Sequence, residues 1–135
     1  MAYAKDVARQ YPLVALATVS IGQLTSGAAL EAIDIPAGAT VLGGWYECTV
    51  AFNSQTSDAV TVSMNGHTYV TDADATALEH TAFTMPTTTS TGLNAVSVPD
   101  TIDVTWTGVG TKGTTGTVLV YVEYILSGRV KEIQP

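Results

Sequence analysis

The stretch IDIPAGATVLGGWYECTVAFNSQTSDAVTVSMNG, residues 33–66, decides the predicted fold of this chain. It contains a strand, a Pro-Gly turn at residues 36–38, a long strand, a Ser/Asn-rich turn and another strand, with no helical period. The pair Asn65-Gly66 is a strong signal for a two-residue type I′ hairpin turn. This quarter of the chain is therefore predicted to form β-hairpins. It holds no cluster of reactive side chains, which favours a scaffold or a binding module over an enzyme.

Side-chain alternation predicts which residues of the strands face the core. In the long strand, residues 40–52, the pair Gly43-Gly44 interrupts the pattern and indicates a bulge or a close backbone approach. Beyond this pair, Trp45, Glu47, Thr49 and Ala51 are predicted to face one way, and Tyr46, Cys48, Val50 and Phe52 the other. Two further strands present inward-facing sets, namely Val60, Val62 and Met64, and Ile102, Val104 and Trp106.

The remaining segments complete an all-β prediction. Further strands are predicted at residues 13–21, 28–35, 59–64, 67–70, 93–98, 101–107 and 117–126. Residues 71–86 are expected to form a loop with one helical turn, capped by Thr71 or Asp72 and running through Leu78. Residues 108–116, GVGTKGTTG, are predicted to form a flexible hairpin loop. Seven or eight strands at hairpin spacing, without strand–helix–strand alternation, predict an antiparallel β-sandwich of jelly-roll-like type.

The length of 135 residues predicts one domain. We expect an N-terminal arm at residues 1–12, a β-sandwich at residues 13–128 and a C-terminal tail at residues 129–135. Residues 2–10 are compatible with a short helix or with an arm that orders on a partner. Residues 1–20 lack the pattern of a signal peptide, and no apolar run is long enough to span a membrane, so no membrane partner is expected.

Charge is scarce and unevenly placed. Charged residues make up 13% of the chain, the net charge is −7, and threonine occurs 22 times. Residues 13–127 hold ten acids and one base, Lys112, which argues against nucleic-acid binding. A Thr-rich surface suits burial in an assembly or the surface of an ordinary all-β protein. The ends carry four bases that either dock onto an acidic neighbour or are solvated, namely Lys5, Arg9, Arg129 and Lys131.

Potential metal ligands are sparse. Asp72 and Asp74 form a D-x-D pair, but the glycine and distal glutamate of a calcium loop are missing, so a solvated acidic turn explains them better. His67 and His80 do not combine with Cys48 or Asp74 at a spacing typical of zinc sites. Cys48 is the single cysteine, so it forms no intrachain disulfide and is expected to be a buried thiol.

No catalytic, cofactor-binding or metal-binding residue is assigned, and the chain is not expected to be an enzyme. It lacks a G-x-S-x-G motif, and Glu47 and Glu123 are better explained as strand carboxylates than as a glycosidase pair. Residues 108–116 lack the helix that a phosphate-binding loop needs. Five aromatic residues either line a sugar-binding face or pack in the core or between subunits, namely Trp45, Tyr46, Trp106, Tyr121 and Tyr124.

Four segments resemble small virion proteins of tailed bacteriophages, described as capsid decoration, cement or head-fibre proteins. They are IDIPAGATVLGG (residues 33–44), AFNSQTSDAVTVS (residues 51–63), TIDVTWTG (residues 101–108) and VLVYVEYILSGR (residues 118–129). The resemblance implies a β-sandwich subunit bound to the outside of an icosahedral head, where it stabilises the shell. It transfers no site residues and implies no cofactor.

The same resemblance implies the major capsid protein as partner and a homo-oligomer, with a trimer favoured over a monomer at the centre of a capsomer. Such a trimer would bury an apolar strand face that includes Trp45 or Tyr121. Residues 1–12 and the basic tail are expected to touch the shell. The expected location is the capsid surface of a virion assembled in the host cytoplasm. The alternative is a receptor- or glycan-binding domain of a phage head or tail fibre.

Overall fold

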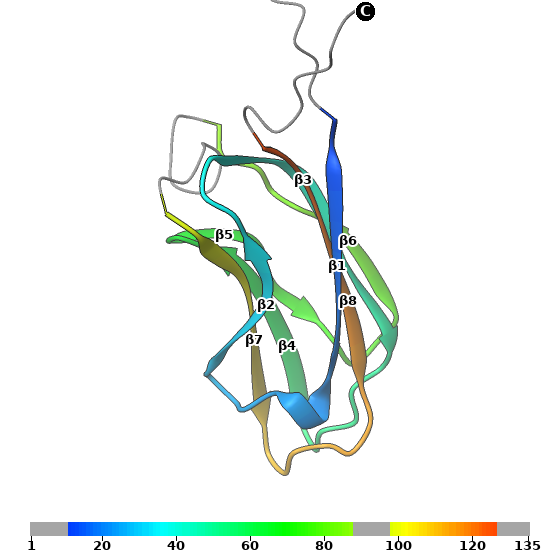
Figure 1. Ribbon diagram of the computed structural model, residues 1–135. Helices are drawn as coiled ribbons and strands as arrows, with labels where there is room; N and C mark the ends of the chain where they lie inside the picture. The colour runs from blue at the N-terminus through cyan, green and yellow to red at the C-terminus, as the bar shows by residue number, and fades with distance from the viewer. Residues whose placement is uncertain (1–10, 88–97, 127–135) are drawn as a thin grey trace, which may run out of the picture.

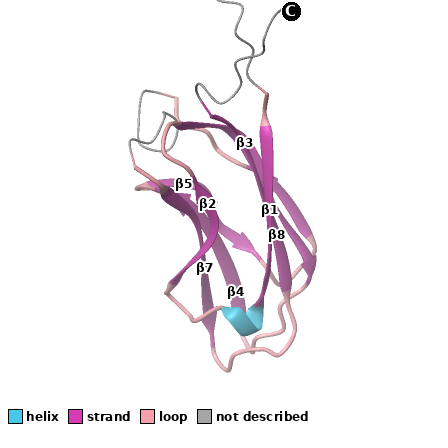
Figure 2. Ribbon diagram, in the orientation of Figure 1, coloured by secondary structure: helices cyan, strands magenta, loops and turns pink. Residues whose placement is uncertain are grey.

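The computed structural model describes residues 11–87 and 98–126 of the chain. Eight strands form two antiparallel sheets that lie face to face (Figure 1). The one helical element in the described residues is a single 3₁₀ turn, η1 (Ile21–Gln23), coloured cyan in Figure 2. None of the described helical residues forms a segment long and apolar enough to cross a membrane. The strands are β1 (Leu13–Ser20), β2 (Ala29–Ile35), β3 (Ala39–Val50), β4 (Ser57–Met64), β5 (His67–Asp74), β6 (Glu79–Ala82), β7 (Asp100–Val109) and β8 (Thr117–Leu126).

The strand order is that of a jelly roll. Sheet A has the order β1-β8-β3-β6, and sheet B has the order β2-β7-β4-β5. The first strand therefore pairs with the last, the second with the seventh, and so on, as in one long hairpin rolled into two layers. The predicted all-β, jelly-roll-like sandwich is confirmed.

Of the consecutive strands, β4 and β5 alone pair within one sheet. Their turn has positive φ angles of 47° at Asn65 and 81° at Gly66, which confirms the predicted type I′ geometry. Every other consecutive pair is split between the sheets. The turn at residues 36–38 and the loop predicted at residues 108–116 were expected to close hairpins. This was wrong, because both connections cross from one sheet to the other.

The core lies between the two sheets and follows the predicted alternation. In β4, Val60 and Val62 are fully buried, and in β7, Ile102 and Val104 are fully buried as well. In β8, alternate residues are also buried, namely Val118, Val120 and Val122. Trp106 and Met64 complete the inward sets as expected.

The Gly43-Gly44 pair marks a break in strand register, as predicted. The register of β3 against β8 shifts between Val41 and Gly43. A Cβ atom on Gly44 would collide with the carbonyl oxygen of Tyr121 and approach the Phe83 ring to 2.6 Å. A second shift follows Cys48 and turns Val50 outward, where it is 46% exposed. The prediction that Val50 faces the same way as Tyr46 and Cys48, which are buried, was therefore wrong.

Residues 71–86 do not contain the expected helical turn. β5 continues to Asp74, and β6 pairs with β3 along residues 45–48. The backbone N–H of Asp72 donates to Oγ1 of Thr61, and this hydroxyl lies 3.2 Å from the Asp72 carboxylate. These bonds hold β5 beside β4, so tertiary pairing replaces local helix formation. The predicted helix at residues 2–10 and most of the predicted strand at residues 93–98 lie outside the described residues.

The two ends of the described chain lie at one end of the sandwich, and two hydrogen-bonded loops lie at the other. Leu13 pairs with Tyr124, so both ends of the described chain leave sheet A at the same end of the molecule (Figure 1). At the opposite end, Oδ1 of Asn53 accepts hydrogen bonds of 2.8 and 2.9 Å from the N–H groups of Thr114 and Thr115. The loop between β7 and β8 is thereby anchored to the loop between β3 and β4.

Candidate interaction surface

The outer face of sheet A carries a row of apolar and aromatic side chains across all four strands. The register places Leu16 beside Tyr121, Tyr121 beside Trp45 and Trp45 beside Ala82. Leu16 is 55% exposed and Trp45 is 44% exposed. Because cross-strand neighbours lie about 5 Å apart, the row forms one continuous surface.

Further apolar side chains widen this row. Val14 lies two residues from Leu16 on β1, and Leu119 lies two residues from Tyr121 on β8, so each points to the same face as its neighbour. Leu42, at the β3 register shift, is also exposed. We call this set the apolar face, and its members are Val14, Leu16, Leu42, Trp45, Leu119 and Tyr121.

Two carboxylates border the apolar face. Glu123 lies between Val14 and Gly43 in the register, on one side of the central row. Glu47 lies beside Leu119 and opposite His80, on the other side. The His80 ring stacks on the Trp45 ring with centroids 6.1 Å apart. Along the strand direction, Glu47 therefore lies on one side of the central row of the apolar face and Glu123 lies on the other.

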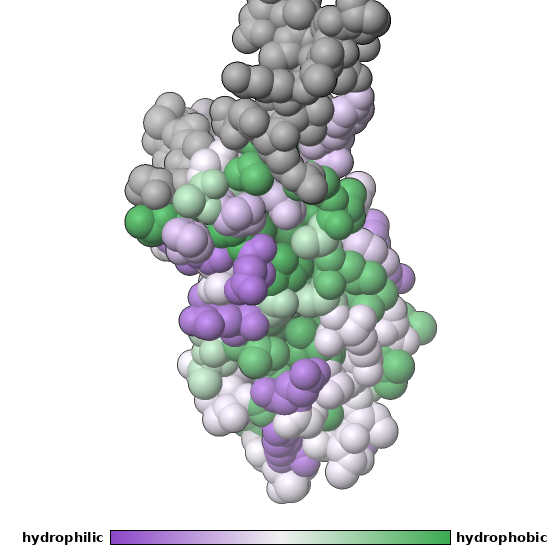
Figure 3. Space-filling model, viewed as in Figure 1, coloured by the Kyte–Doolittle hydropathy of each residue, from purple (hydrophilic) through white to green (hydrophobic). Residues whose placement is uncertain are grey.

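The outer face of sheet B has the opposite character. Its rows place Glu31 beside Asp103, and Thr105 beside Thr61. The hydroxyl of Thr101 donates a 2.7 Å hydrogen bond to Asp103. In Figure 3, which views the sandwich from the edge formed by β1 and β2, apolar residues gather between these strands and hydrophilic residues lie toward β2. Sheet B thus presents a Thr- and Asp-rich face, and sheet A presents the apolar one.

The predicted aromatic set is divided between surface and core. Trp45 and Tyr121 lie on the apolar face, whereas Tyr46 is fully buried and Trp106 is 3% exposed. Tyr124 is partly buried and packs against the core. A single sugar-binding face that contains all five aromatic residues is therefore excluded by geometry.

The Glu47–Glu123 pair does not have the geometry of a glycosidase site, and Asp72 and Asp74 each bind a different threonine. Glu47 and Glu123 lie on neighbouring strands, but four residues of strand separate their rows, or about 14 Å. This distance is too long for a glycosidase pair, which needs about 5–10 Å. Asp74 accepts hydrogen bonds from the backbone and hydroxyl of Thr76, which hold the pKa of its carboxyl below the usual value. Asp72 is bound to Thr61 instead.

The histidines and the cysteine lie apart. His67 Nε2 lies 2.9 Å from the carbonyl oxygen of Thr84, and its ring meets Tyr69 edge-on. His80 lies on the outer face of sheet A, whereas Cys48 points into the core of the sandwich. Within residues 11–87 and 98–126, no three His, Cys, Asp or Glu side chains are grouped as metal ligands.

Two polar side chains of β3, Cys48 and Tyr46, lie in the core, and burial raises the pKa of both. Desolvation raises the pKa of the Cys48 thiol, which is 2% exposed. Desolvation also raises the pKa of Tyr46, and the nearby thiol raises it further. The Tyr46 hydroxyl meets neither this thiol nor any other described group in hydrogen-bonding geometry. Both groups are therefore held neutral, which suits packing rather than chemistry.

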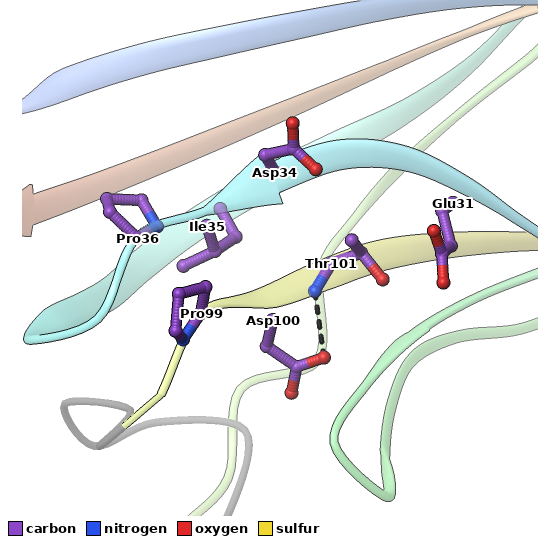
Figure 4. Close-up of a pocket in the computed structure, with 7 residues that line it drawn as sticks. All are labelled: Glu31, Asp34, Ile35, Pro36, Pro99, Asp100 and Thr101. Atoms are coloured by element: carbon purple, nitrogen blue, oxygen red, sulfur yellow. Dashed lines mark hydrogen bonds between the residues drawn. The ribbon is translucent and has the colours of Figure 1, made fainter.

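A shallow cavity of about 490 Å³ lies where β2 ends and β7 begins. Figure 4 shows its lining residues, namely Glu31, Asp34, Ile35, Pro36, Pro99, Asp100 and Thr101. Asp100 accepts a 2.8 Å hydrogen bond from the backbone of Thr101, while Asp34 and Glu31 point in other directions. The three carboxylates do not converge on one point, so the cavity offers no donor set for an ion.

Sequence reasoning identified Trp45 and Tyr121 as an apolar strand face but missed the aliphatic members of the apolar face. The missed signal is in β1, where Val14 and Leu16 alternate with Ala15 and Ala17. The small alanines are the partly buried residues, and the larger side chains are exposed. A strand with its bulk on the exposed side is typical of a surface that contacts another molecule.

The fold is shared with chains from bacteriophage capsid structures. One is from the structure described as "Cyanophage Pam1 capsid asymmetric unit", with a TM-score of 0.59 and 21% identity, covering 93% of this chain and 91% of that chain. Another is from "Capsid of Ralstonia phage GP4", with a TM-score of 0.58 and 14% identity, covering 93% of this chain and 90% of that chain. A third is from "Acidic stable capsid structure of Helicobacter pylori bacteriophage KHP30".

This third chain has a TM-score of 0.57 and 15% identity, and the match covers 87% of this chain and 94% of that chain. No protein-family model matches the sequence. No curated protein matches it either. At these identities the comparison establishes a common fold that extends over nearly the whole length of each chain.

Proposed function

We propose that this chain is a structural virion protein that binds the outer surface of a phage capsid and stabilises the shell. The observation that carries the proposal is the fold match to chains from three phage capsid structures, each over roughly nine-tenths of both chains. The matches cover 87–93% of this chain, so they involve the β-sandwich as a whole and not one hairpin of it.

The surface of the chain supports the same role. The apolar face is suited to a permanent contact with another protein, since exposed apolar area contributes to association when it is removed from water. No described group of side chains is arranged for metal binding. A rigid sandwich that binds the assembled shell but not its separated parts stabilises the shell by mass action.

The proposed partner is the major capsid protein, and we propose that the subunits associate as a homo-oligomer, with a trimer favoured. The protein would act on the capsid surface of a virion assembled in the host cytoplasm, without contacts to nucleic acid or membrane. Residues 1–12 and 129–135 would extend from the sandwich, the domain of residues 13–128, to reach the shell. Deletion of residues 2–10 should then release the protein from heads without unfolding it.

A receptor- or glycan-binding domain of a head or tail fibre is the second candidate. The observation that favours it is the exposed Trp45 ring beside Tyr121, because flat aromatic rings stack on sugars. The aliphatic neighbours of these rings argue against it, since they donate no hydrogen bonds to hydroxyl groups. Decoration of the capsid therefore fits the composition of the apolar face better.

Purified virions distinguish the two functions. Densitometry should find many copies of the chain per particle, and heads that lack it should release their DNA at a lower temperature. Adding the purified protein should restore the stability of these heads. A few copies per particle, unchanged head stability and binding to a glycan array would instead support the receptor-binding function.

A further inference from the structure

We infer that the apolar face of sheet A docks on the capsid shell, and that its occupant is a protein surface with an aliphatic centre and basic side chains on two sides. The inference rests on the proposed function and assigns its contact surface. It adds a contact on the sandwich itself to the contacts proposed for the terminal segments.

The apolar face is continuous across three neighbouring strands of sheet A. Val14 is 67% exposed and Leu16 is 55% exposed, and they lie on the strand next to Tyr121. Across β8, Trp45 continues the surface on β3. Soluble monomeric proteins rarely leave apolar side chains exposed on adjacent strands unless the surface binds something.

The two carboxylates that border the apolar face have no partner among the described residues. Glu47 and Glu123 make no ion pair or hydrogen bond with any described residue, and they lie about 14 Å apart. The one Lys or Arg among the described residues, Lys112, donates a 2.6 Å hydrogen bond to the carbonyl of Leu24 and lies over the Trp106 ring. No base among residues 11–87 and 98–126 is therefore left to pair with the two glutamates, and a basic partner surface would supply complementary charges.

The same charges argue against a second copy as the occupant. Two copies that met through their apolar faces would bring Glu47 and Glu123 toward carboxylates of the same kind. The outer face of sheet B offers no better match, since Glu31 and Asp103 form one of its rows. A basic partner surface satisfies both glutamates, whereas a second copy seated on the apolar face would repel them, so the proposed homo-oligomer would form through other surfaces of the sandwich.

The experiment measures co-sedimentation of purified protein with phage heads that lack it. Leu16→Lys places a charge at the centre of the apolar face, and Thr107→Lys is the matched control on an exposed residue of sheet B. We expect Leu16→Lys to weaken binding by about 30-fold or more, which is the effect of losing a central contact. Thr107→Lys should bind like the wild type. Val14→Lys serves as a second variant if Leu16→Lys does not fold by circular dichroism.

A charge-reversal pair tests the chemistry of the partner. Glu123→Lys should weaken binding about tenfold at low salt, and the loss should shrink at high salt because ions screen the contact. Its control is Glu31→Lys on the outer face of sheet B, which should leave binding unchanged. Stronger binding by Glu123→Lys would overturn the assignment of a basic partner.

The remaining outcomes separate the inference from the proposed function. If the wild type does not bind heads, both are wrong. If the wild type and Leu16→Lys bind equally, the proposed function stands and the docking surface is wrong. Light scattering on the free proteins completes the test, because a change in the oligomeric state of Leu16→Lys would assign the apolar face to a second copy and overturn the inference.

Discussion

The indole N–H of Trp106 donates a 2.7 Å hydrogen bond to the carboxylate of Asp58, which is 2% exposed. The other carboxylate oxygen accepts a hydrogen bond of 3.1 Å from the backbone N–H of Ser54. Asp58 therefore connects the core strand β7 to the loop before β4. It is also the one buried charged residue in the described part of the chain.

Replacing Asp58 with alanine should lower the free energy of unfolding by about 3 kcal/mol. The substitution leaves the buried indole N–H of Trp106 without its acceptor, and hydrogen bonds to charged groups contribute about 1.5–3 kcal/mol each. Urea denaturation followed by circular dichroism measures the loss. Asp34→Ala, at an exposed position of β2, is the control and should change stability by less than about 1 kcal/mol.

Replacing Gly44 with alanine should destabilise the protein by more than about 2 kcal/mol, whereas Gly43→Ala should be nearly neutral. A Cβ atom on Gly44 meets the Tyr121 carbonyl and the Phe83 ring, and overpacking of this kind typically costs about 1–3 kcal/mol. Nothing lies within 4 Å of a Cβ atom on Gly43. Equal denaturation midpoints for the two variants would contradict the close approach of β3 to β8.

Stability should fall as the pH rises above about 9. Burial raises the pKa of Cys48 from 9.0, and burial raises the pKa of Tyr46 and Tyr69 from 10.0. The unfolded chain therefore deprotonates first, so the stabilisation is complete below the unfolded values and is lost as the pH rises through the folded ones.

The variant Tyr46→Phe tests the alkaline effect. It should unfold with a shallower pH dependence between about pH 9 and 11, because one raised pKa is removed. At neutral pH its stability should stay within about 1 kcal/mol of the wild type, since the lost hydroxyl has no hydrogen-bonding partner in the described structure. An unchanged slope would show that Tyr46 ionises as freely in the folded state as in the unfolded one.

Trp45 should supply nearly all of the fluorescence that acrylamide quenches. It is 44% exposed, whereas Trp106 is 3% exposed. Stern–Volmer plots should therefore show strong quenching for the wild type and weak quenching for Trp45→Phe. If Trp45→Phe were quenched as strongly as the wild type, the division of the two tryptophans between surface and core would be wrong.

The sequence by itself determined the local structure. The period of two in residues 59–64 and 101–107 predicted inward-facing sets because successive side chains of a strand point to opposite sides. Asn65-Gly66 predicted its turn because asparagine and glycine tolerate positive φ angles.

Only the tertiary structure decided which strands pair, where β6 lies and which face is exposed. A turn such as residues 36–38 has the same local chemistry whether the chain returns in the same sheet or crosses to the other. Likewise, β1 carries apolar side chains on both faces. Its sequence pattern therefore does not show that Leu16 points outward and Ala15 points inward. Those choices depend on the neighbouring strands and on the volume between the sheets, where the small alanines of β1 pack and the bulky Val14 and Leu16 point outward.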